Sequence, residues 1–336
     1  MTKKGIIKTA GLALLLTFCV SFYSCEKEGV FNPKQKISKV FTDVVTFNYE
    51  WDEETGEYIR KEFVYPKQLI QAWTWNDKKL DKIDFWGFYF SGWGDEWVFE
   101  TELVKTDRYV YENDRLAKID HGDGYFSIIS YDGSKYKRLE SYDDENNLLV
   151  YMDFIYDKNK ISRIMIEEMW GGFIIDKNAE LKLLATFIPK EFASKMVKKN
   201  EKNRNTKGIN SVIYVFDYTY NGDNIKEIGV EMNYGTDDRM TGTINYVAYD
   251  NKNNPFYRKL EFDIDTEFEF GIAAVTSKNN PLEIHAIYFE DDDPEPYELS
   301  MLSKYSYSKN YPVEVEQIMT FNSLQSPTNK IYYEYK

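Results

Sequence analysis

One short unit recurs along this chain: an aromatic residue, a polar turn, and apolar residues five and eight positions after the aromatic. Copies begin at Trp75, Tyr111, Tyr131, Tyr156 and Tyr220. Asn, Asp and Gly fill most of the positions after the aromatic, and these residues supply the backbone conformations that tight turns need. Because every copy must adopt a similar local structure, the repeat constrains the fold more strongly than composition does.

Each unit reads as the end of one strand, a turn and the start of the next strand. In most copies a second aromatic precedes the first by two residues, at Trp73, Tyr109, Phe154 and Tyr218. Residues two apart lie on the same face of a strand, so the unit predicts a hairpin. A later variant places Pro281 and Pro312 after the turn, where proline suits the first residue of a strand.

The repeat and the composition together predict an all-β fold. Aromatic residues make up 17% of the chain, and they favour strands. We expect a long antiparallel meander of hairpins that forms a curled sheet or partly closed barrel. One continuous sheet is favoured over two halves at 41–175 and 209–336. A short helical insert is expected at about 176–208.

Alternation along the segment 260–270 indicates which face of the sheet is wet. Leu260, Phe262, Ile264, Phe268 and Phe270 alternate with acidic residues. Carboxylates that face lipid are costly, so we expect the charged face to meet water. The sheet is therefore predicted to lie near a membrane without crossing it.

The first residues resemble a bacterial lipoprotein signal. Lysines precede an apolar run from Ala10 to Val20, and Ser24 stands before Cys25. The run is shorter than the roughly 20 apolar residues that a membrane span needs. We predict a signal peptide at 1–24, lipidation of Cys25, a tether at 25–40 and a β domain at 41–336. An ordinary signal peptide with an incidental cysteine is the alternative.

Lipidation would place the protein at the outer membrane, with the membrane as its partner through the lipid anchor. Glu26-Lys27-Glu28 follows Cys25 and resembles the acidic stretch that directs Bacteroidota-type lipoproteins to the cell surface. The repeats resemble YD repeats of Rhs-type proteins. With the lipoprotein start, residues 70–336 resemble a Bacteroidota surface lipoprotein family of unknown function with a porin-like β fold. The resemblance implies a curled antiparallel sheet and carries no catalytic residues.

Charge and composition bear on several classes of function. A net charge of −14 argues against a nucleic-acid partner, because phosphate binding needs clustered Lys and Arg. No phosphate-binding glycine pattern or zinc spacing occurs in the sequence, and we predict no cofactor and no metal. The acidic run from Glu290 to Pro296 could hold calcium, but a solvated loop is favoured. His121 and His285 are expected to be structural, since nothing in the sequence places either beside a nucleophile.

Aromatic residues are densest between Phe85 and Trp97. Neighbouring aromatics in a strand cannot all face one core, so some must meet solvent, another layer or a ligand. Partly exposed rings stack on sugars, which makes Trp86, Trp93 and Trp97 candidates for ligand stacking. A hairpin buried on both sides is the favoured alternative.

These observations predict a non-enzymatic, lipid-anchored envelope protein with a binding or assembly role. Its partner would be another envelope protein or a glycan. The alternative function is a glycan-binding accessory lipoprotein of a nutrient-uptake system. An envelope hydrolase is the least favoured class, because no catalytic constellation is recognisable.

Overall fold

The computed structural model describes residues 29–52, 56–91, 98–169, 211–232, 240–260, 276–290, 293–326 and 328–336. Within these ranges no helix is long and apolar enough to span a bilayer. The strands are β1 (Ile37–Asp52), β2 (Glu57–Asn76), β3 (Lys79–Ser91), β4 (Val98–Glu112), β5 (Arg115–Gly122), β6 (Tyr125–Asp132), β7 (Lys135–Tyr142), β8 (Leu148–Asp157), β9 (Lys160–Met169), β10 (Ser211–Asn221), β11 (Asn224–Met232), β12 (Met240–Tyr249), β13 (Pro281–Glu290), β14 (Asp293–Ser308), β15 (Tyr311–Phe321), β16 (Leu324–Gln325) and β17 (Asn329–Tyr335).

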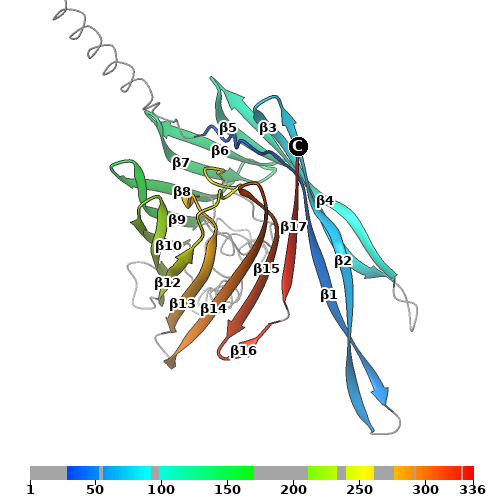
Figure 1. The fold of residues 1–336 in the computed structure, drawn as a ribbon. Coiled ribbons are helices and arrows are strands. Elements are labelled where there is room, and N and C mark those ends of the chain that lie inside the picture. The colour runs from blue at the N-terminus through cyan, green and yellow to red at the C-terminus, as the bar shows by residue number, and fades with distance from the viewer. Residues whose placement is uncertain are drawn as a thin grey trace, which may run out of the picture.

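The strands form one closed antiparallel barrel (Figure 1). Neighbours in the chain pair with one another, β10 pairs with β9, and β17 pairs with both β15 and β1 to complete the ring. The two-residue β16 pairs only with β15. The predicted all-β meander and its single continuous sheet are confirmed. The predicted helical insert at 176–208 and residues 261–270 of the alternating segment lie outside the described residues.

The apolar faces of the strands point into the barrel. In β8, Val150, Met152 and Phe154 are buried, while Asp153 and Ile155 between and beyond them are not. Buried apolar side chains from strands all around the ring form a single cluster. Side chains from every wall can converge in this way only in the interior, so the unburied alternate residues form the outer wall.

Ion pairs cross between neighbouring strands on the outer wall. Arg138 lies opposite Asp153 and Arg163 lies opposite Asp217, each pair with an N–O distance of 2.6 Å. These side chains are about a third to a half exposed. Because ionised side chains facing lipid are costly, this part of the wall is suited to water.

The recurring aromatic residues line one end of the barrel, which we call the turn rim. This end holds the tight turns at 77–78, 113–114, 133–134, 158–159, 222–223 and 309–310. A cation lies over each ring, in the pairs Lys36–Trp75, Lys79–Tyr111, Arg115–Tyr131, Lys135–Tyr156 and Lys160–Tyr220. Lys36 immediately precedes β1, and each of the other four cations follows the turn of the preceding hairpin. The Arg115 guanidinium, 3.5 Å from the Tyr131 ring centroid, also donates to the Gly133 carbonyl at 2.7 Å. The repeat therefore links each hairpin to the next one.

The polar tip of several of these rings bonds the backbone of the neighbouring hairpin. The Tyr131 hydroxyl donates to the Leu116 carbonyl at 2.5 Å, and the Tyr220 hydroxyl donates to the Ile161 carbonyl at 2.8 Å. The Trp75 indole N–H donates in the same way to the Ile37 carbonyl at 2.7 Å. In all three bonds the acceptor is a carbonyl near the start of one strand. The donor is an aromatic side chain near the end of the strand that pairs with it.

Removing one such hydroxyl should weaken the rim measurably. We expect Tyr131→Phe to lower the free energy of unfolding by about 1 kcal/mol, because the bond to Leu116 is lost while the ring remains. Tyr125→Phe, an identical change at an exposed tyrosine near the opposite end, should change it by less than about 0.5 kcal/mol. Urea denaturation compares the two, and equal midpoints would contradict the role assigned to the hydroxyl.

Two segments pack against the turn rim from within. The Phe31 and Phe256 rings lie 6.4 and 6.1 Å from the Trp73 ring, and Phe256 also meets Tyr333 at 5.8 Å. The segment 250–260, which follows β12, thus reaches β2 and β17 across the ring. These contacts place aromatic side chains across the turn-rim end of the interior.

The predicted tether at 25–40 overlaps the barrel. Strand β1 begins at Ile37, which is fully buried, and Phe31 is buried as well. The Gly29 carbonyl accepts from the Leu116 N–H at 2.9 Å, and the Gly29 N–H donates to the Tyr136 hydroxyl at 2.8 Å. Residues 29–40 therefore belong to the β domain, because their apolar side chains complete the rim core.

Candidate functional site

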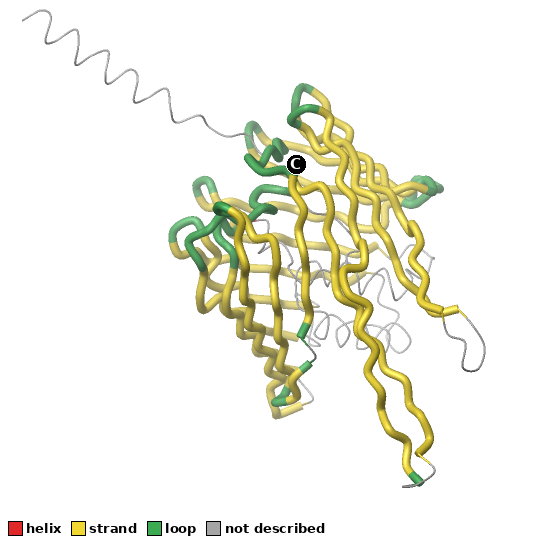
Figure 2. The backbone as a smooth tube through the Cα atoms, turned by 45° about the vertical axis from the view of Figure 1, so that its right-hand side comes forward, coloured by secondary structure: helices red, strands yellow, loops and turns green. Residues whose placement is uncertain are grey.

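Two hairpins extend beyond the closed ring as two-stranded ribbons (Figures 1 and 2). β1 pairs with β17 only up to Thr42, and β2 pairs with β3 only from Gln71. Residues 43–52 and 56–70 therefore form a first arm, in which β1 and β2 pair only with each other among the described residues. Residues 86–91 and 98–103 form a second arm, where β4 is the one strand that pairs with β3 in the part of the chain that the structure describes.

The arms carry many of the large apolar side chains that remain exposed. On the first arm these are Phe63 and Val64; on the second arm and next to its base they are Tyr89, Val98, Leu103 and Val104. Most of them are about half exposed, at 51–56% for Val64, Val98, Leu103 and Val104. Apolar side chains that gather in this way mark interaction surfaces.

A stack of rings holds the two arms together. The Tyr65 and Phe99 rings lie 4.3 Å apart and nearly parallel at 13°, and Phe88 stacks on Phe99 at 6.0 Å. The stack joins β2 to β4 where neither pairs with the other through backbone. Packing between aromatic side chains thus fixes the relative position of the arms.

Of the three tryptophans predicted to stack on a ligand, Trp86 lies at the base of the second arm. Its side chain is half-buried opposite Leu103 in the β3–β4 register. Its indole nitrogen is buried and has no hydrogen-bond partner within the described residues. Trp93 and Trp97 lie outside the described residues. Of the aromatic cluster around Trp86, Phe88 packs within the second arm on Phe99, the ring that stacks on Tyr65 of the first arm.

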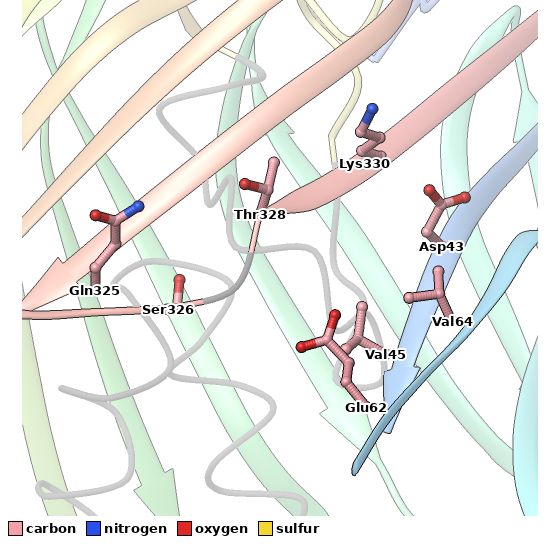
Figure 3. A pocket seen from close by; sticks show the side chains of 8 residues that line it. All are labelled: Asp43, Val45, Glu62, Val64, Gln325, Ser326, Thr328 and Lys330. Atoms are coloured by element: carbon pink, nitrogen blue, oxygen red, sulfur yellow. The ribbon is translucent and has the colours of Figure 1, made fainter. Parts of the chain in front are cut away.

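A groove of about 530 Å³ lies between the first arm and the start of β17 (Figure 3). We call it the seam groove, because it opens where β17 ceases to pair with β1. Its lining side chains are Asp43, Val45, Glu62, Val64, Gln325, Ser326, Thr328 and Lys330. The groove is thus polar on the β17 side and combines valines with carboxylates on the arm side.

Most charges in the seam groove have partners, which leaves Glu62 as the most exposed one. Asp43 accepts from the Lys67 N–H at 2.9 Å and from the Tyr332 hydroxyl at 3.0 Å. Partial burial and this bond to Asp43 raise the pKa of Tyr332 to about 12. Lys330 pairs with Glu316 at 2.9 Å. Glu62 is exposed, so the groove offers a carboxylate to a cationic group.

A hydrogen-bonded series of polar side chains inside the barrel was not predicted from the sequence. His121 Nδ1 lies 2.8 Å from Asp107 Oδ1, and His121 Nε2 lies 2.9 Å from Ser127 Oγ, which in turn lies 2.8 Å from Ser141 Oγ. The sequence alone does not place His121 beside a nucleophile, whereas strand pairing sets it beside Ser127. The bonded residues lie 6 to 14 positions apart along the chain, on successive strands, and the pairing of β4 through β7 brings them together.

Burial decides what this polar chain can do. Ser127 has no exposed surface and Asp107 only 1%, so a substrate cannot reach the hydroxyl in this conformation. Lys105 also pairs with Asp107 at 3.2 Å. The groups satisfy one another, as buried polar side chains must. The second histidine, His285, lies exposed on β13 and pairs with Glu283 at 2.8 Å.

The acidic run at 290–296 includes the connection between β13 and β14. Asp291 and Asp292 lie outside the described residues, and Asp293 begins β14. Among the described residues, no group of three or more His, Cys, Asp or Glu side chains is placed to hold a metal ion. Cys25 also lies outside the described residues.

Comparisons with known proteins place this chain in no established family. No protein-family model matches it, and no curated protein matches it. Among solved structures, it is similar to a porin-like protein from Bacteroides uniformis with a TM-score of 0.47 and 12% sequence identity. That similarity covers 92% of this chain and 100% of the Bacteroides chain.

Proposed function

We propose that this chain is a non-enzymatic, lipid-anchored protein of the bacterial outer membrane that binds another envelope protein through its two arms. The signal-like start and Cys25 support the anchor. The ion pairs on the outer wall support a barrel that stands in water beside the membrane, because lipid would disfavour them. The barrel would act as a rigid scaffold.

The observation that carries the binding role is the concentration of exposed apolar side chains on the arms. Val64, Val98, Leu103 and Val104 are each about half exposed. They lie on or next to the parts of β2 and β4 that project from the ring. Surfaces of this kind remain exposed in soluble proteins mainly where a partner covers them. Ordered arms would keep the entropic cost of binding low.

A photo-crosslinking side chain at Val104 should trap the partner in the producing cells. We expect a discrete adduct from position 104 and none from position 247, because Val247 is equally exposed at 56% but lies on the barrel wall. Electrophoresis and mass spectrometry of the adducts make the comparison. Identical adducts at both positions, or none at 104, would contradict binding through the arms.

The second candidate is a glycan-binding accessory lipoprotein of a nutrient-uptake system. Trp86 favours it, because its side chain is only half-buried and so leaves part of the indole ring open to stack on a sugar. The packed rings of Tyr65, Phe88 and Phe99 favour a structural use of the same cluster. Stacking by Trp93 and Trp97 remains a prediction from sequence.

A further inference from the structure

We propose that the free edge of β1, from Asp43 to Asp52, takes up an extended segment of a partner protein as an added antiparallel strand, with a Lys or Arg of that segment facing Glu62. The inference rests on the proposed binding role and names the chemistry of the partner. It joins three observations: an unpaired strand edge, a groove beside that edge, and the charge of the groove.

The edge of β1 that faces away from β2 can form backbone hydrogen bonds with an added strand. β1 is bonded to β2 along 39–52, whereas its other edge is bonded to β17 only along 37–42. Within the described residues, the backbone groups that point away from β2 beyond Thr42 have no strand beside them. An added strand would extend the ladder that β17 begins, since β17 is already antiparallel to β1.

The free edge begins with a β-bulge between Thr42 and Val44, but beyond Val44 its sequence lacks the Lys and Pro that commonly protect an edge against strand addition. Exposed edges in soluble proteins are commonly blunted by Lys, by Pro or by shortness. The segment 43–52 reads DVVTFNYEWD and contains neither Lys nor Pro. Its Val, Thr, Phe, Tyr and Trp residues favour strands. Such an edge is a ready template for pairing with another chain, which favours a partner strand as its occupant.

The seam groove specifies the side chains of that strand. Val45 and Val64 line the groove beside Asp43 and Glu62, so a segment laid along β1 meets both apolar and acidic neighbours. Lys330 is held by Glu316, which leaves the carboxylate of Glu62 to attract a cation. Side chains two apart share a face. The matching segment therefore has a Lys or Arg two residues from an aliphatic residue.

Charge argues against a second copy of this chain as the occupant. Pairing of two β1 edges would bring two acidic grooves into one interface, and like charges across paired strands are destabilising. Segment 43–52 has three acidic residues and no basic one. A basic extended segment from a different protein would instead place positive side chains next to these carboxylates.

Peptides test the proposal on the purified, full-length mature protein. The probes are two labelled ten-residue peptides of alternating Val and Thr that differ only in a central Lys or Glu. We expect fluorescence anisotropy to show about fivefold tighter binding of the Lys peptide at low salt, since an exposed ion pair contributes about 1 kcal/mol. Hydrogen exchange should show protection of amides in 43–52 when the Lys peptide binds, and none in β5 or β6.

Matched variants separate charge recognition from strand addition. Glu62→Gln should reduce the preference for the Lys peptide to less than about twofold, whereas Glu298→Gln, which alters an exposed carboxylate on the barrel wall, should leave it unchanged. Equal binding of both peptides by the unaltered protein, or binding without protection of 43–52, would overturn the proposal. A crosslink at Val104 together with either outcome would leave binding through the arms intact and remove only the added strand.

Discussion

The Cys25→Ala chain is expected to carry no fatty acid and to leave the membrane fraction. The chain has only two cysteines, and Cys19 lies within the predicted signal peptide, so Cys25 is the one thiol of the predicted mature chain. Stable attachment of a water-facing barrel needs acyl chains, because each buried methylene contributes about 0.8 kcal/mol to membrane binding. Metabolic labelling with an alkyne fatty acid and fractionation measure the two effects.

The matched control is Cys19→Ala, which changes the other cysteine within the signal. This chain should retain label and sediment with membranes. Label that persists after Cys25→Ala, or an unlabelled native chain, would show that the cysteine is incidental and that the signal is an ordinary secretory one. If the native chain does carry the label, protease treatment of intact cells tests which side of the outer membrane the barrel occupies. If it does not, that treatment gives no information about surface exposure.

The second large effect is expected from Asp107→Ala inside the barrel. Asp107 is 1% exposed and pairs with both His121 and Lys105. Removing this carboxylate takes an ionic partner from two largely buried basic side chains, and breaking a buried pair in this way costs about 3–5 kcal/mol. Urea denaturation should show the loss as a lower midpoint. The result would identify the Asp107–His121–Ser127 chain as part of the core.

Glu283→Ala is the matched control, because it removes the carboxylate from the other histidine–carboxylate pair. His285 and Glu283 are 51% and 34% exposed, and surface pairs contribute about 0–1 kcal/mol. An Asp107→Ala chain as stable as the Glu283→Ala chain would refute the structural role. Hydrolysis of ester substrates that disappears in Ser127→Ala would instead favour the hydrolase class.

The sequence was sufficient for the turns and for the alternation along strands, which depend on neighbouring residues. Asx and Gly residues after Tyr111, Tyr131 and Tyr220 mark turns that the structure contains, because turn conformation is a property of a few adjacent residues. Pro281 and Pro312 stand at the start of β13 and β15 as predicted. The alternation of buried and unburied residues likewise follows from the two-residue period of a strand.

Tertiary structure decided the features that join distant parts of the chain. Closure of the barrel depends on β1 meeting β17, whose partners Ile37 and Tyr335 stand at opposite ends of the sequence. The hydrogen bonds from His121 to Asp107 and Ser127 depend on strand register, and a shift of one residue would turn those side chains to the other face. The seam groove exists because β17 stops pairing at Thr42 while β1 continues. Periodic local sequence specifies hairpins, whereas the order, register and ends of their pairing come from packing across the whole ring.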